Sequence, residues 1–189
     1  MSGDYVLVVE GLDSLGDIES LDADILANAR NAINKALDRT RTSSDKAIRE
    51  SLNFPARYLS QRLTVKERAR GTTLQGMISG RDRPTSLARF ASNRSQTPGK
   101  AGVRVQVGLA AKMMNRAFLM KLNNGNLGLA LRLKEGERLA NKKQLVKVGK
   151  GLYLLYGPSV DQAFATVMPE QEDNAAEFLE REFLRLMEL

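Results

Sequence analysis

The sequence contains neither cysteine nor histidine, and this double absence excludes most of the chemistry that enzymes use. Without cysteine there are no disulfides, thiol nucleophiles or cysteine-type zinc sites. Without histidine there are no Ser–His–Asp triads, histidine metal centres or histidine general bases. We therefore expect a protein that is not an enzyme, has no metal site and uses no cofactor.

Long hydrophobic runs are absent as well. No apolar stretch approaches the roughly 20 residues that a membrane helix needs, so we expect no contact with a membrane. The opening residues MSGDYVLVVEGLDS are acidic and lack the basic start of a secretory signal. Apolar residues make up 42% and charged residues 27% of the 189 residues, which is near the globular average and predicts a folded chain.

Basic residues are scarce at the two ends of the chain and acidic residues are scarce in its middle. Residues 1–26 hold seven acids and no base, and residues 151–189 hold eight acids and two bases. Residues 27–116 hold nineteen bases and five acids, and residues 117–150 hold eight bases and two acids. The basic middle could face nucleic acid, attract the acidic ends of a neighbouring subunit, or form a separately solvated face. These three interpretations stay open at this point.

Helical periodicity marks both ends of the chain. Apolar residues recur at helical spacing over about 18–40, a polar Thr-Arg-Thr-Ser-Ser stretch follows, and a second helix is predicted over 45–52. A short helix over 56–63 follows Pro55. Near the C-terminus we expect one helix over 160–167 and a final helix that opens at Pro169. Its predicted core stripe consists of Ala176, Leu179, Phe183, Leu186 and Met187.

Strand patterns fill the middle of the chain. Alternation predicts strands over 63–70, 73–79 and 102–108. Asn-Gly at 124–125, between the apolar runs 117–122 and 127–133, is a strong hairpin signal, because both residues tolerate positive φ. A last strand is expected over 152–156, after a connecting region rich in lysine.

These elements predict an α+β fold with N-terminal helices, one antiparallel sheet of about five or six strands, and C-terminal helices. We expect an acidic N-terminal arm over residues 1–17 and a single domain over residues 18–189. Residues 80–101 contain two prolines and few large apolar residues, and are expected to form a long basic loop. Leu87 and Phe90 are its candidate anchors against a neighbouring subunit.

Residues 47–63 admit a second interpretation, as a helix-turn-helix that reads DNA. A polar second helix would carry Arg57, Gln61 and Arg62, which are residue types that contact base edges. A proline opens that helix, however, and a strand pattern follows it without a third helix. A DNA-binding regulator is therefore the alternative function.

The central block LNFPARYLSQRLTVKERARGTTLQGMISGRDRPTSLARF, residues 52–90, resembles the minor tail protein Z (tail-completion) family of long-tailed bacteriophages and prophages. The resemblance lies in the Phe-Pro turn, Tyr58-Leu59 with Arg62-Leu63-Thr64-Val65, the hairpin around Gly71, and the segment from Arg83 to Phe90. It covers roughly residues 18–189.

This resemblance implies a structural virion protein that acts at the neck, at the head-proximal end of the tail, and assembles in the host cytoplasm. Similar proteins form rings, commonly hexamers, between the tail-terminator ring and the head-side connector, around the passage for genomic DNA. The family has no catalytic residues to carry over. We expect head–tail joining by a homo-oligomer that makes non-specific contacts with DNA.

Two sets of charged residues are candidates for these contacts. The basic set would face DNA or an adjacent subunit, and strand alternation allows only about half of it to share a face; it consists of Arg57, Arg62, Arg68, Arg70, Arg81, Arg83, Arg89 and Arg94. The acidic set would meet a neighbouring subunit and consists of Glu177, Glu180 and Glu182.

Overall fold

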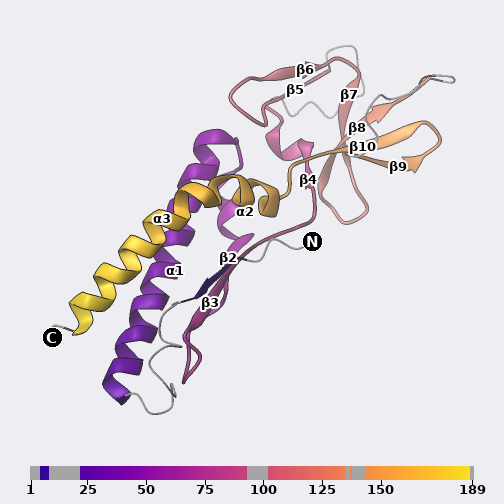
Figure 1. Cartoon of the computed structure of the whole chain (residues 1–189). Coiled ribbons are helices and arrows are strands. Elements are labelled where there is room, and N and C mark those ends of the chain that lie inside the picture. The colour runs from indigo at the N-terminus through magenta and orange to yellow at the C-terminus, as the bar shows by residue number, and fades with distance from the viewer. Residues whose placement is uncertain (1–4, 9–21, 93–101, 135–136, 138–143, 188–189) are drawn as a thin grey trace. The chain divides into compact units, whose positions relative to one another are not determined.

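A computed structural model describes residues 5–8, 22–92, 102–134, 137 and 144–187 (Figure 1). The chain divides into two compact units, each of which is assembled from separate chain segments. Unit 1 comprises residues 1–48, 59–82 and 161–189, and unit 2 comprises residues 49–58 and 83–160.

The first helix, α1, runs without a break from Ala23 to Ser51. The predicted interruption between 40 and 45 is therefore wrong. The hydroxyl of Thr42 donates to the carbonyl of Asp38, and the hydroxyl of Ser43 donates to the carbonyl of Thr40. Hydroxyls that donate to carbonyls of the preceding turn have a hydrogen-bond partner inside the helix, so this polar stretch does not end α1.

The last helix, α3, is also one element, from Val160 to Met187, with Pro169 inside it. The prediction of a separate helix that opens at Pro169 is wrong. Proline removes one backbone hydrogen bond and usually bends a helix. Phe164, Val167 and Met168 are buried just before the proline, and Gln171 and Ala175 are buried after it. Packing on both sides of Pro169 holds the helix together.

Within unit 1, α1 and α3 pack against each other in antiparallel order (Figure 1). Four contacts show this order, because the residue numbers increase along α1 while those of the partners decrease along α3. They join Asn28 with Leu186, Lys35 with Glu182, Arg39 with Phe178, and Ser43 with Gln171. The face of α1 that is fully buried includes Ile33, Ala36 and Leu37.

Unit 1 also holds a three-stranded antiparallel sheet in the order β1-β3-β2. Its strands are β1 Tyr5–Val8, β2 Leu63–Glu67 and β3 Gln75–Gly80, and the five-residue helix α2, Ala56–Ser60, precedes β2. A Cβ on Gly76 would lie 2.2 Å from Cδ1 of Leu37, so glycine permits close packing of α1 on β3. The side-chain amide of Asn34 exchanges hydrogen bonds with both backbone groups of Ala69.

Unit 2 is built around a five-stranded sheet in which β10 pairs with β4, β8 and β9, and β8 pairs with β7. The predicted hairpin is confirmed: β7 and β8 flank a turn in which Gly125 has φ +78°. A separate two-stranded pair, β5–β6, was predicted only in its first strand, and β9 was expected to be a connection. The elements of unit 2 are β4 Thr85–Ser86, η3 Leu87–Phe90, β5 Val103–Val105, β6 Lys112–Met114, β7 Ala117–Lys121, β8 Leu127–Arg132, β9 Leu145–Gly149 and β10 Leu152–Gly157.

Residues 80–92 of the expected loop contain β4 and the 3-10 helix η3, and residues 93–101 lie outside the described residues. Phe90 is only 2% exposed and lies edge-on against Phe54, with ring centroids 5.0 Å apart. Leu87 packs against Gly157, where an added Cβ would come within 2.9 Å of Leu87 Cδ2. Phe90 therefore anchors this segment to the core of its own unit, which leaves almost none of its side chain for contact with a neighbouring subunit.

The predicted α+β class, with helices at both ends and antiparallel strands between them, is confirmed. The largest sheet has five strands, while the described pairings also define a sheet of three strands and one of two. Every paired strand among the described residues runs antiparallel to its partner.

Candidate assembly and DNA-contact surfaces

The two units carry charge of opposite sign. Unit 2 contains 17 Lys and Arg against 3 Asp and Glu, whereas unit 1 contains 12 against 19. Formal net charges of +14 and −7 follow for units 2 and 1. The segregation seen along the sequence is therefore also a segregation between folded bodies, and unit 2 carries the excess of positive charge that attracts polyanions, while unit 1 adds exposed arginines of its own.

Four of the candidate arginines belong to unit 1. Arg62 and Arg70 are exposed, the latter beside the tight turn at Gly71, whose φ is +55°. Arg81 is half-buried, and its backbone N–H donates to the carbonyl of Arg62. Arg68 is exposed but already engaged, because it makes a two-pronged ion pair with Asp38 at 2.6 and 3.1 Å. This pairing raises the pKa of the Arg68 guanidinium.

Three further candidates belong to unit 2. Arg57 and Arg83 are exposed. The guanidinium of Arg89 lies 4.2 Å from the centre of the Tyr58 ring, a cation–π contact that fixes the side chain while leaving it exposed. The ring of Tyr58 is stacked on Phe54, and its hydroxyl lies 3.3 Å from Thr85 Oγ1. The remaining candidate, Arg94, lies outside the described residues.

Residues 47–63 do not form the helix-turn-helix that the alternative function requires. Residues 47–51 are the end of the long helix α1, and α2 has only five residues before β2 begins at Leu63. Gln61 and Arg62 lie beyond α2, so they are not on a recognition helix. Tyr58 and Leu59 are buried, which leaves α2 without a polar face long enough to enter a major groove.

The three acidic candidates on α3 separate into two kinds. Glu177 and Glu180 are exposed. Glu182 is buried and accepts hydrogen bonds from Lys35 at 2.6 Å and from Arg185 at 2.9 and 3.1 Å. The Arg185 guanidinium first, and then the Lys35 ammonium, lower the pKa of Glu182 to about 2. Glu182 therefore ties α3 to α1 within unit 1, and the expectation that it serves a neighbouring subunit is not supported by its position.

The exposed side of α3 is a stripe that the sequence analysis did not identify. Glu177, Glu180, Leu184 and Met187 follow one another at intervals of 3, 4 and 3 residues, which places them on one helix face. Leu184 is 53% and Met187 42% exposed. We call these four residues the α3 stripe. The predicted core stripe of α3 was thus partly wrong: Ala175, not Ala176, is buried, and Met187 stays partly exposed although its sulfur lies 3.8 Å from the Asn28 amide nitrogen of α1.

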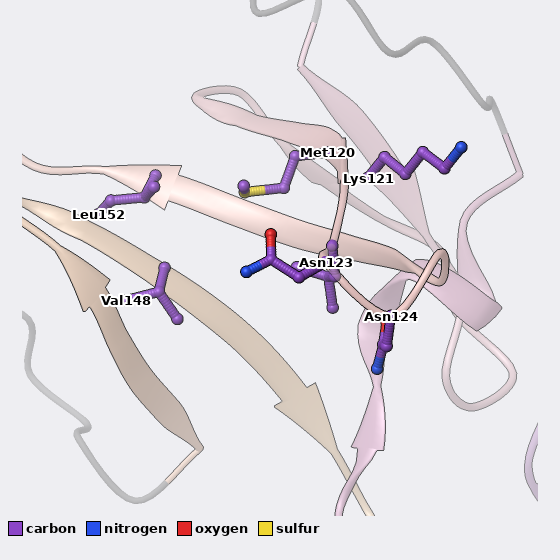
Figure 2. Close-up of a pocket in the computed structure, with 7 residues that line it drawn as sticks. Met120, Lys121, Asn123, Asn124, Val148 and Leu152 are labelled. Atoms are coloured by element: carbon purple, nitrogen blue, oxygen red, sulfur yellow. The ribbon is translucent and has the colours of Figure 1, made fainter.

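An apolar pocket of about 390 Å³ lies in unit 2 (Figure 2). Met120 of β7, Val148 of β9 and Leu152 of β10 project from three strands, and Asn123 lies beside them in the β7–β8 turn. The lining is completed by Lys121, Leu122 and Asn124. We call this the unit 2 pocket. Sequence periodicity does not reveal it, because it forms where the ends of three strands meet.

Among the described residues, no group of three or more acidic side chains is gathered in a way that could hold a metal ion. In the same part of the chain, no helix has the length and apolar character needed to cross a membrane.

Comparisons with known proteins give the family. No curated protein and no solved structure matches the chain. The family described as prophage minor tail protein Z (GPZ) matches residues 9–183, which is nearly the whole chain and agrees with the resemblance seen in residues 52–90. The chain therefore belongs to the prophage minor tail protein Z family, and its role is a structural one in the tail of a phage particle.

Proposed function

We propose that this protein completes the phage tail: it forms a ring, of six copies, at the head-proximal end of the tail and joins the tail to the head around the DNA passage. The observation that carries the proposal is the charge division between the units, +14 on unit 2 and −7 on unit 1. Copies arranged head to tail can bring opposite charges together at each contact, and this arrangement supports a closed ring.

The proposed neighbours are the tail-terminator ring on one side and the head-side connector on the other. Assembly takes place in the host cytoplasm, and the finished protein resides in the neck of the virion. Removing the gene from its phage tests this assignment. Full heads and separate tails should accumulate in electron micrographs while infectious particles fall sharply, and a normal titre of joined particles would contradict the proposal.

A ring around DNA should contact phosphates rather than bases, because such contacts let the genome slide. The exposed Arg62, Arg70 and Arg83 are the proposed contacts in this respect. Replacing all three by alanine should weaken binding to random duplexes and reduce the salt dependence, by about 0.9 in slope per lost phosphate contact. Arg68→Ala is the matched control, because Arg68 already pairs with Asp38.

Duplex binding should be measured at two salt concentrations, with random DNA and with fragments of the phage genome. Weak binding that is steep in salt and indifferent to sequence is expected. Tight binding to one site would contradict a ring along which the genome slides. Absence of binding even at low salt would assign the arginines to contacts between subunits.

A further inference from the structure

We infer that the α3 stripe of one copy docks in the unit 2 pocket of a second copy of this chain. The inference rests on the proposed ring and names the two surfaces that would build it. It concerns one pair of side-chain clusters, so it can fail while the ring itself stands.

The α3 stripe offers the apolar side chains. Leu184 and Met187 are neighbours one turn apart at the end of α3 and are about half exposed. The opposite side of α3 is already occupied, because Glu182 and Phe178 contact α1. Leu184 contributes little to the fold of unit 1, whereas Met187 lies at the border of the helix pair, with its sulfur 3.8 Å from the Asn28 amide nitrogen of α1. Apolar surface left exposed on both side chains suits an interface core.

The unit 2 pocket offers the complementary cavity. Its apolar walls are Met120, Leu122, Val148 and Leu152, and Val148 remains 47% exposed. A cavity of roughly 150 Å³ already accepts a benzene-sized group, so one of about 390 Å³ has room for both a leucine and a methionine side chain. Asn123 and Asn124 also line the cavity, and in Figure 2 the Asn123 amide is directed toward the apolar side chains whereas that of Asn124 is directed away from them.

The charges beside the α3 stripe and the unit 2 pocket are opposite in sign, which favours a second copy of this chain as the partner in the pocket. Glu180 lies one turn before Leu184 on the stripe, and Glu177 lies one further turn back. Lys121 belongs to the pocket lining, and exposed Lys150 lies in the turn between Val148 and Leu152. Apolar residues preceded by acids would therefore meet an apolar cavity whose lining includes Lys121, with Lys150 in the turn that joins two of the lining residues. The same chain carries both halves of this match.

The geometry of such a contact also suits a ring. The stripe and the pocket are different surfaces, so the contact is heterologous, and each docked copy still offers a free stripe and a free pocket. Repetition of one such contact closes a ring when the rotation between copies allows it.

Disulfide trapping tests the contact, since the full chain contains no cysteine of its own. Two single variants, Leu184→Cys and Val148→Cys, are mixed, with a size tag on one of them, and oxidised mildly. A mixed disulfide between the tagged and untagged chains is expected. Leu109→Cys replaces Val148→Cys in the matched control, because Leu109 of unit 2 is 86% exposed and does not line the pocket.

A charge exchange provides the second arm, measured by sedimentation of the full chain. Glu177→Lys with Glu180→Lys should weaken self-association about tenfold, and Lys121→Glu with Lys150→Glu should do the same. Mixing these two variants should restore association, because opposite charges then face each other again. All four side chains lie at the surface, so the fold should be kept.

Three outcomes separate the hypotheses. A wild-type chain that remains a monomer at every concentration and salt would refute the proposed ring. A wild-type oligomer without the mixed disulfide, or with the control linking as well as the Val148 variant, would overturn this inference and leave the ring. Weakened association in both charge variants that mixing does not restore would also overturn it, since the two surfaces would then have other partners.

Discussion

Phe90 gives the sharpest test of the structure, because its position decides whether residues 85–90 belong to the core of unit 2 or to an interface. The side chain is 2% exposed, lies edge-on against Phe54, and approaches Gly157 of β10. All three residues belong to unit 2. Phe90→Ala should therefore destabilise the isolated subunit, whether or not any other copy is present.

The size of this effect follows from what the substitution removes. Burial of a phenylalanine side chain is worth about 1.5–3 kcal/mol, and an edge-to-face aromatic pair adds about 0.5–1.5 kcal/mol. The cavity that remains brings typical Phe→Ala losses to about 3–5 kcal/mol. We expect a loss of about 3–4 kcal/mol, which is a large fraction of the stability of most domains.

Urea unfolding followed by tyrosine fluorescence is a suitable assay. The chain has no tryptophan, and three of its four tyrosines, Tyr58, Tyr153 and Tyr156, lie in unit 2. The midpoint of the tyrosine transition should fall sharply in Phe90→Ala, whereas Leu109→Ala should shift the free energy of unfolding by less than about 0.5 kcal/mol. A loss below about 1 kcal/mol for Phe90→Ala in the monomer would refute the assignment of Phe90 to this core.

Three further predictions concern charge and backbone. Because ion pairs hold the pKa of Glu182 at about 2, below its ordinary 4.5, the stability it contributes is present above about pH 4.5 and is lost as the pH falls towards 2; the difference in thermal midpoint between wild type and Glu182→Gln should shrink over that window. Glu177→Lys with Glu180→Lys should leave the thermal midpoint nearly unchanged, whereas Glu182→Lys should lower it clearly, because it places a third cation beside Lys35 and Arg185; equal midpoints would contradict the burial of Glu182. Gly102→Ala should lower the free energy of unfolding by about 2–5 kcal/mol, because φ is +65° and the added Cβ would lie 2.7 Å from the backbone of the facing strand. Gly125→Ala should lower it by only about 1–2 kcal/mol, because φ is +78° but the added Cβ meets open space. Similar unfolding midpoints for the two variants would show that the facing strand can move away.

Features that depend on local sequence were predictable. The turn between β7 and β8 follows from Asn-Gly, because glycine adopts positive φ without steric cost, and Gly125 is the residue of the pair that does so. The α+β order follows from the change of apolar period along the chain. The length of α1 did not follow, because a Thr-Ser stretch can either cap a helix or bond back to its preceding turn, and only packing decides between the two.

The sequence predicts which charged residues the candidate surfaces contain, but not which of these residues are already paired within the fold. The sequence does not distinguish Arg68 from the other candidate arginines. Its guanidinium is paired with Asp38, which lies thirty residues earlier, and no residue near Arg68 in the sequence indicates this ion pair. Glu182 differs from Glu180 through its ion pairs with Arg185, three residues further along α3, and with Lys35, which is supplied by another helix. The α3 stripe could have been found from its 3-4-3 spacing. The unit 2 pocket could not, since three separate strands build it.

The hydrogen bond from the Asp161 N–H to the carbonyl of Arg81, 3.1 Å long, has a consequence for synthesis of the protein. This bond joins the chain on either side of residues 83–160, a segment of unit 2 that lies in the sequence between two parts of unit 1. During translation α3 therefore leaves the ribosome only after this whole segment has been made. At about 5–20 residues per second, the buried face of α1 has to wait on the order of 4–16 s for its covering helix. Chaperone dependence during translation should therefore fall on the N-terminal helix, and a circular permutant that begins at α3 would shorten the wait.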